Sequence, residues 1–282
     1  MKIITPFFSI VIPTLNEENF LPRLLACLAK QTYKDFEVIV CDGNSGDKTV
    51  EKAFQFINKL PQLLVLSNLK RNVSYQRNLG ARQAKGVYLQ FMDADVVIKK
   101  GYLNNLQKNL QKKDIPVATT WMMPDSKHPA DEAMIFLTNI VIETSRYLDI
   151  PFAPGYNIVV KRSLFAKIGG FGEHIRHAED HHFVQQAAGK GYLMSVFKEP
   201  KLTVSLRRLR REGRLTVARK YAKAILYILF KGPITRDIFD YPMGGHLYDK
   251  NPQKKTIIDY LHTLSKNGEE TANRVLKDTF EI

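Results

Sequence analysis

Acidic side chains stand just after three apolar runs of this sequence, where each run ends. The runs and the acids that follow them are residues 7–12 with Glu17, residues 36–41 with Asp42, and residues 87–92 with Asp93 and Asp95. In an open parallel sheet, ligands bind outside the carboxyl ends of the strands. Each strand end alone has a simple explanation: Asn16 as a helix cap, Asp42 as a turn former, and Asp93 and Asp95 as solvated strand-end residues. Together they predict one polar binding site.

The spacing of Asp93 and Asp95 predicts a cation site. If strand geometry continues past residue 92, both carboxylates leave the same side of the backbone and can share one divalent ion. Mg²⁺ or Mn²⁺ held by one or two carboxylates keeps its other positions for water and phosphate oxygens. The pair therefore predicts a diphosphate site with the cation as Lewis acid. Arg77, one predicted helix upstream, is a candidate contact to phosphate or base.

A second acidic pair, Glu179 and Asp180, precedes a predicted helix over residues 180–189. A general base for a hydroxyl has to lie within hydrogen-bond reach of it, and a neighbouring acid or histidine can tune its pKa. A carboxylate at a helix start is also an ordinary cap. For Asp180 taken alone, both interpretations stay open.

The elements that position these residues follow from the hydropathy pattern. Apolar, β-branched runs predict strands, at residues 7–12, 36–41, 63–67, 87–92, 117–122, 156–160 and 193–197. Helical spacing predicts a helix capped by Asn16 and further helices, at residues 48–59, 74–84, 102–111, 130–147 and 180–189. Strands that alternate with helices imply βαβ units and a mostly parallel sheet.

Composition narrows the class of protein. The chain has 282 residues, 44% of them hydrophobic, which is enough for a packed core. Its two cysteines exclude a disulfide scaffold, and we expect buried thiols in a reducing compartment. No apolar stretch is long enough for a membrane-spanning helix, so a cytoplasmic protein is expected.

Positive charge gathers toward the C-terminus. Lys and Arg outnumber Asp and Glu by 42 to 28 in the whole chain. Residues 201–231 contain ten basic side chains and one acidic side chain, Glu212. We expect one domain over residues 1–205 and a basic helical extension over 206–282. Two interpretations of the extension stay open: a solvated face on a helix that packs on the domain, or a helix on an anionic membrane surface. No nucleic-acid-binding signature accompanies the charge.

Six segments, in this order, resemble the family 2 glycosyltransferases of the GT-A fold. They are residues 9–17 (SIVIPTLNE), 40–49 (VCDGNSGDKT), 75–86 (YQRNLGARQAKG), 91–95 (FMDAD), 168–173 (IGGFGE) and 178–180 (AED). The resemblance covers residues 7–205. It implies a nucleotide-binding α/β/α sandwich with a mostly parallel sheet. It also implies inverting, metal-dependent transfer of a sugar from a nucleotide donor to a hydroxyl acceptor, which could be lipid-linked.

The resemblance implies roles for individual residues as well. Donor contacts fall on Pro13, Thr14, Asn16, Glu17, Asp42, Arg77, Asp93 and Asp95. Asp95 and Asp93 would bind Mn²⁺ or Mg²⁺, and Asp42 would read the base of a UDP- or GDP-sugar. Asp180 would be the catalytic base, supported by Glu179. A further metal ligand could be His181, His182 or His246, among which the sequence does not choose.

Two other functions fit parts of the pattern. An apolar strand that ends in Asp-x-Asp is also the nucleophile motif of haloacid-dehalogenase-like phosphatases, in which Asp93 would attack phosphate. That motif usually opens its domain, whereas here it ends the fourth predicted strand. The third reading is a module that binds a nucleotide sugar without turnover.

Overall fold

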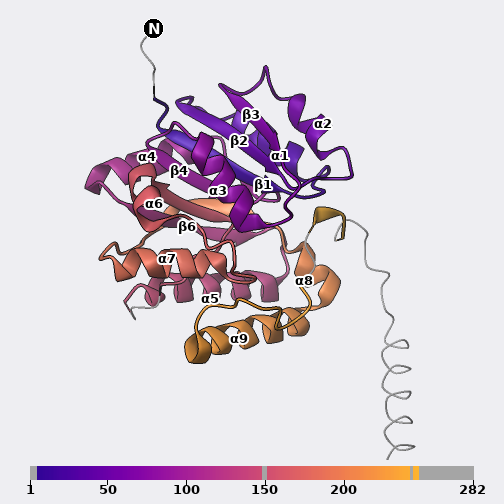
Figure 1. Ribbon diagram of the computed structural model, residues 1–282, viewed down its shortest axis with the longest axis vertical. Helices are drawn as coiled ribbons and strands as arrows, with labels where there is room; N and C mark the ends of the chain where they lie inside the picture. The colour runs from indigo at the N-terminus through magenta and orange to yellow at the C-terminus, as the bar shows by residue number, and fades with distance from the viewer. Residues whose placement is uncertain (1–4, 148–150, 242–243, 248–282) are drawn as a thin grey trace, which may run out of the picture. The chain divides into compact units, whose positions relative to one another are not determined.

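One mixed sheet organises the chain, in the strand order β3-β2-β1-β4-β7-β6-β8-β5 (Figure 1). The computed structural model describes residues 5–147, 151–241 and 244–247, all of which belong to one compact unit, Met1–Asp249. The strands are β1 Phe8–Thr14, β2 Phe36–Asp42, β3 Leu63–Ser67, β4 Tyr88–Met92, β5 Val97–Ile98, β6 Val117–Pro124, β7 Asn157–Lys161 and β8 Ser195–Val204.

The parallel half of the sheet brings the predicted site residues to one edge. β3, β2, β1 and β4 are mutually parallel, and Thr14 at the end of β1 is in register with Asp42 at the end of β2. β7 then runs antiparallel between β4 and β6, with Asn157 opposite Met92. Of the seven pairs between described strands, four are parallel and three antiparallel.

The described residues form nine α-helices. They are α1 Leu21–Ala29, α2 Thr49–Phe54, α3 Val73–Gln83, α4 Tyr102–Lys113, α5 Pro129–Ser145, α6 Arg162–Ile168, α7 Glu179–Gly189, α8 Arg207–Glu212 and α9 Arg214–Lys231. Every residue of β1, β2 and β4 is buried, as expected for continuous apolar runs.

Helix α3 approaches β1 and β2 closely because it carries a glycine at the contact. A Cβ at Gly80 would lie 2.9 Å from Cys41 Sγ and closer still to Val11 Cγ1. This close packing matters for function, because α3 also carries Arg77 toward the ends of the strands.

Some local predictions are wrong. Asn16 does not cap a helix: α1 begins at Leu21, and Asn16 lies in the left-handed region at φ 53°. Its side chain instead accepts a hydrogen bond of 2.7 Å from the Gly46 amide, which ties the first loop to the second. Strand β5 was not predicted, and β8 is longer than expected, running on to Val204.

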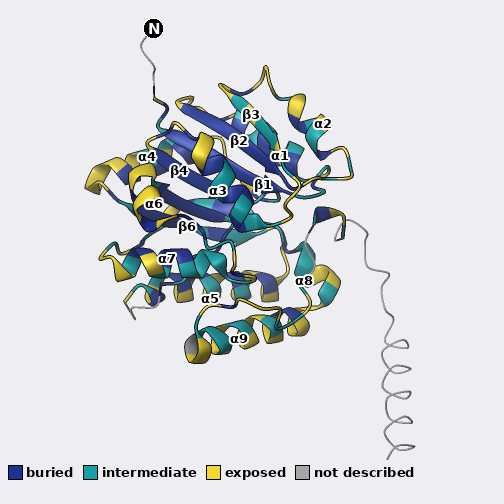
Figure 2. Cartoon of the chain, viewed as in Figure 1, coloured by how far each residue is buried: buried dark blue, intermediate teal, exposed yellow. Residues whose placement is uncertain are grey.

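Within the predicted C-terminal extension the structure describes α8, α9 and a non-helical stretch over residues 232–241, in the same compact unit as the sheet. The predicted boundary at residue 205 stays a proposal, and residues 248–282 lie outside the described residues. Much of α9 is exposed (Figure 2). Leu215 and Leu226 are among its exposed side chains, whereas Val217 is buried. None of the described helices is long and apolar enough to cross a membrane.

Candidate active site

On the side of the candidate site predicted to bind the nucleotide sugar, several hydrogen-bond donors hold the Asp42 carboxylate in one orientation. Thr14 Oγ1 donates to Asp42 Oδ1 at 3.1 Å, and Ser45 donates from its hydroxyl at 2.5 Å and from its amide at 2.8 Å. Gln76 adds bonds of 2.7 Å to the carbonyls of Thr14 and Cys41. The ends of β1 and β2 are therefore fixed to each other by polar contacts.

Arg77 joins the aspartate after β4 to the acidic pair at the start of α7. Its guanidinium donates to Glu179 Oε1 at 2.6 Å, Asp93 Oδ1 at 3.1 Å and the Gly155 carbonyl at 3.1 Å. Burial opposes its positive charge, but the carboxylates of Glu179, Asp93 and Asp180 outweigh burial and raise its pKa. Arg77 is therefore held as a fixed cation within the protein.

Gly155 connects this network to Asp180. Its amide donates to Asp180 Oδ2 at 2.6 Å, while its carbonyl accepts from Arg77. The other oxygen of Asp180 accepts from the His181 amide at 2.8 Å. A Cβ at Gly155 would lie 2.7 Å from Arg77 Nη2 and 3.0 Å from Asp180 Oδ2, so a larger residue would displace the ends of these side chains.

A second arginine, which sequence reasoning did not place here, holds the other acids. Arg207 forms a two-pronged pair with Glu17, at 2.8 and 2.7 Å, and its Nε lies 3.0 Å from Asp95 Oδ2. The guanidinium also lies over the Phe20 ring, 4.4 Å from the centroid. Glu17, Asp95 and Arg207 therefore form one cluster of ion pairs.

Burial sets the ionisation of these two acids. It raises the pKa of Glu17 to about 7, although Arg207 lowers it. It raises the pKa of Asp95 to about 6, again against Arg207, with a further rise from the neighbouring charge of Asp93. The charge of Asp93, which pairs with Arg77, acts on Asp95, which pairs with Arg207. The two groups of ion pairs are therefore electrostatically linked.

Arg207 belongs to a series of arginines that attach α8 and α9 to the domain. Arg210 forms a two-pronged pair with Asp125, at 2.8 Å for both bonds, and Arg214 pairs with Asp131 at 2.8 Å. The spacing of 207, 210 and 214 is helical. This spacing, and acids without an obvious partner in the β6–α5 region, were the signals that could have identified the series.

Asp93 and Asp95 fit a divalent cation that takes most of its ligands from a bound diphosphate and from water. Strand geometry ends at Met92, so Asp93 and Asp95 turn toward different arginines instead of leaving one side of a strand. The described residues contain no cluster of three or more His, Cys, Asp or Glu side chains for a metal. Two hard carboxylates nevertheless suit Mg²⁺ or Mn²⁺ when diphosphate oxygens and water complete the shell.

The three candidate histidines differ in their surroundings. His181 Nδ1 lies 2.9 Å from the Ala153 carbonyl, and its ring lies on Phe152. Burial lowers the pKa of His182. His246 Nδ1 lies 3.0 Å from Asn16 Nδ2, next to the predicted donor loop. Of the three, His246 is the one in contact with a predicted donor residue.

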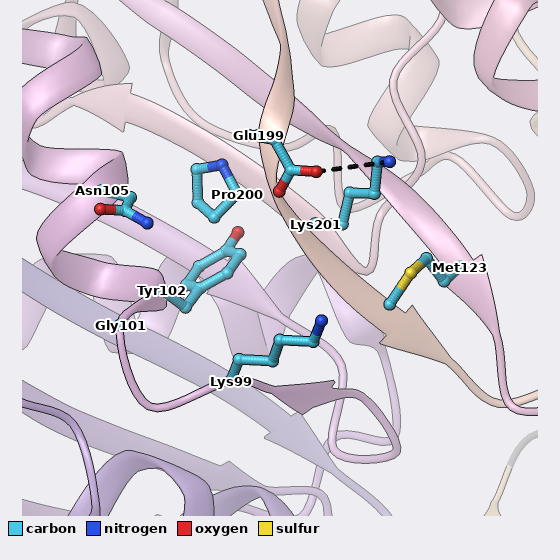
Figure 3. A pocket seen from close by; sticks show the side chains of 8 residues that line it. All are labelled: Lys99, Gly101, Tyr102, Asn105, Met123, Glu199, Pro200 and Lys201. Carbon is cyan, nitrogen blue, oxygen red and sulfur yellow. Dashed lines mark ion pairs between the residues drawn. The ribbon is translucent and has the colours of Figure 1, made fainter.

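A separate cavity lies near the far edge of the sheet (Figure 3). Its volume is about 430 Å³, and its lining contains none of the predicted site residues. The lining residues are Lys99, Gly101, Tyr102, Asn105, Met123, Glu199, Pro200 and Lys201. Glu199 and Lys201, both on β8, form an ion pair of 3.3 Å in this lining.

Comparison with known proteins identifies the family. Residues 9–169 match the model of glycosyl transferase family 2. The chain belongs to this family. An uncharacterized glycosyltransferase of Haemophilus influenzae is 27% identical over 201 residues, which are 69% of this chain and 63% of that protein. The match thus spans just under two thirds of the length of that relative.

Solved structures support the fold. TarS 1–349 of S. aureus in complex with UDP has a TM-score of 0.59 and 21% identity, covering 79% of this chain and 72% of that one. The mannosyltransferase PcManGT from Pyrobaculum calidifontis, in complex with GDP-Man and Mn²⁺, has a TM-score of 0.61 and 22% identity, covering 78% and 64%. The predicted GT-A type α/β fold is confirmed.

Proposed function

We propose that this protein transfers a sugar from a nucleoside diphosphate donor to a hydroxyl acceptor, with inversion and with the help of Mn²⁺ or Mg²⁺. Membership of glycosyl transferase family 2 supports the reaction class. The structural relatives hold UDP or GDP-Man, and one holds Mn²⁺. We extend these to the present chain as a UDP- or GDP-sugar donor and a divalent cation.

The observation that carries the proposal is the double contact of Gly155. Through it, Asp180 and Asp93 lie on one network, although they come from α7 and from the end of β4. An inverting transfer needs a base and a diphosphate site on opposite sides of one sugar. A separation of these acids by the sheet would have excluded that arrangement.

Asp180 is the proposed base because both of its oxygens are held in place. It would take the proton from the acceptor hydroxyl as that oxygen attacks the anomeric carbon, from the face opposite the diphosphate. Glu179 is a positioning residue in this scheme. Its carboxylate neutralises Arg77, and burial followed by the charge of Asp180 raises its own pKa.

Asp95 and Asp93 would hold the cation, and Thr14, Asn16, Glu17 and Asp42 would contact the nucleoside with Pro13 shaping the loop. When bound, the cation neutralises charge on the leaving diphosphate. Arg77 adds a fixed positive charge beside Asp93. We propose that the base read by Asp42 carries an N–H donor, as uracil and guanine both do.

A panel of nucleotide sugars with Mn²⁺ tests this function. We expect release of the nucleoside diphosphate from one member of the panel. Asp95→Ala should abolish metal-dependent donor binding, whereas Asp180→Asn should bind donor normally and lose transfer. Asp114→Asn, which removes an exposed partner of Lys161, is the matched control. Equal loss of donor binding and transfer in Asp180→Asn would exclude its role as the base.

The same assay separates the alternatives. A phosphatase with Asp93 as nucleophile would release inorganic phosphate from monoesters, and a binding module would bind donor without product. The family match does not favour either.

We further propose that the acceptor is lipid-linked and that the protein works at the cytoplasmic face of an anionic membrane. The observation in favour is apolar exposure on two helices, α5 with Phe136, Leu137 and Val141, and α9 with Leu226 and Phe230, of which Phe230 is 81% exposed. Such side chains suit the headgroup region. Sedimentation with anionic and neutral liposomes at low salt tests this. Absence of binding to both would overturn it.

A further inference from the structure

Arg207 is paired with Asp95, one of the two proposed cation ligands. Its Nε is 3.0 Å from Asp95 Oδ2, and both terminal nitrogens bind Glu17. The three side chains are largely buried, with 14% of Arg207, 17% of Asp95 and 9% of Glu17 exposed. Ion pairs with so little water around them are poorly screened.

A guanidinium and a divalent ion compete for such a carboxylate. Both are cations that take their partner's oxygen directly, and two positive groups on one buried oxygen repel each other. Asp93 is engaged as well, because Arg77 binds its Oδ1. In the absence of nucleotide, a divalent ion therefore has to compete with Arg77 for Asp93 and with Arg207 for Asp95.

We propose that Arg207 is a donor-site residue that competes with the divalent cation for Asp95 and so makes cation binding depend on the nucleotide. A diphosphate brings negative charge to the site and gives the guanidinium an anionic partner besides Glu17 and Asp95. Cation and nucleotide then strengthen each other's binding, and this coupling is reciprocal. The inference rests on the proposed function, since it takes Asp95 as a cation ligand.

The attachment of α8 explains why Arg207 stays within reach of Asp95. Arg210, one helical turn further along α8, is fixed to Asp125 by two bonds of 2.8 Å. The Leu206 amide donates to the same aspartate at 2.9 Å. Arg210 attaches the helix but pairs with neither Glu17 nor Asp95, so its removal is the matched control for the removal of Arg207.

The experiment measures Mn²⁺ binding by electron paramagnetic resonance, with the full chain and no activity assay. Wild type, Arg207→Gln, Arg210→Gln and the double variant Arg207→Gln/Asp95→Asn are titrated with Mn²⁺ alone. Each is then titrated at saturating UDP and at saturating GDP. Circular dichroism and a thermal melt establish that each variant is folded, and Arg207→Met, which also removes the charge, replaces Arg207→Gln if the latter does not fold.

We expect Arg207→Gln to bind Mn²⁺ alone about tenfold more tightly than wild type, within the usual range of coupling between sites. Arg210→Gln should match wild type, and Asp95→Asn should remove the gain. The nucleotide should tighten Mn²⁺ binding less in Arg207→Gln than in wild type. Chelation by free nucleotide is the same for all variants and cancels in this comparison.

Equal or weaker Mn²⁺ binding in Arg207→Gln would overturn the inference. The nucleotide arm distinguishes its failure from that of the proposed function. If wild type binds Mn²⁺ with UDP or GDP but Arg207→Gln gains nothing, only the competition is wrong. If no variant binds Mn²⁺ under any condition, the metal-dependent function fails together with the inference.

Discussion

Replacement of Arg77 by methionine should destabilise the protein mainly through Glu179. The variant keeps most of the apolar stem but leaves that buried carboxylate, 12% exposed, without its cation. Breaking a buried ion pair by removing one partner costs about 3 to 5 kcal/mol. The pair with Asp93, which is 40% exposed, adds about 1 kcal/mol or less. The melting temperature should fall by about 6 to 20 °C.

The cost should depend on pH in a defined direction. Burial and Asp180 already raise the pKa of Glu179 above its ordinary value of 4.5, and loss of Arg77 removes the group that lowers it. A carboxyl with a raised pKa in the folded state is easier to ionise in the unfolded chain. The folded variant therefore loses stability as pH rises above that ordinary value, so the penalty should be larger at pH 8 than at pH 5.

Urea unfolding at both pH values, followed by fluorescence, gives the free energies of unfolding. The double variant Arg77→Met/Glu179→Gln should recover more than half of the loss, because no unpaired charge remains buried. Arg162→Met is the control, since its Nε donates to the Gly86 carbonyl and its loss should cost about 1 kcal/mol. A single variant within about 1 kcal/mol of wild type, or a double variant no more stable than the single one, would refute this reasoning.

Three further predictions concern close contacts. Gly155→Ala should reduce transfer by more than tenfold while the far-ultraviolet circular dichroism stays unchanged, because a Cβ there displaces both Arg77 and Asp180; unchanged turnover would contradict the network. Gly80→Ala should lower the free energy of unfolding by about 1 to 3 kcal/mol in a urea melt, since α3 has no room for a methyl group against Val11. Cys41 should resist iodoacetamide at pH 8 in the native protein, because it is fully buried and burial raises its pKa to about 12; mass spectrometry reads its alkylation, and rapid labelling of the folded chain would disagree.

The parallel half of the sheet was predictable because its strands are buried on both faces. Continuous apolar runs such as residues 36–41 carry that signal in the sequence itself. Where a side chain has two uses, the sequence was ambiguous. Asn16 is a residue type that commonly caps helices, but here its side-chain oxygen accepts a hydrogen bond from the Gly46 amide. Helix α1 begins five residues after Asn16.

The charged part of the site was less predictable, because pairing across the chain leaves no periodic pattern. Asp42, Asp93 and Asp180 could be proposed from their positions after strands and before a helix. Arg207 could not, since Glu17 lies 190 residues away from it. The basic run favoured solvent or lipid as its partner, whereas three of its arginines pair with acids of the domain.

The arginine series on α8 and α9 limits how this protein can be divided or recombined. A truncation after Ser205 would leave Glu17 and Asp95 facing each other without the counter-ion that Arg207 supplies. A chimera that borrows these helices from another family member would meet the same defect unless it also imports acids matching Asp125 and Asp131. A library of chimeras should therefore take the loop that carries Glu17 and the helices α8 and α9 from the same parent sequence.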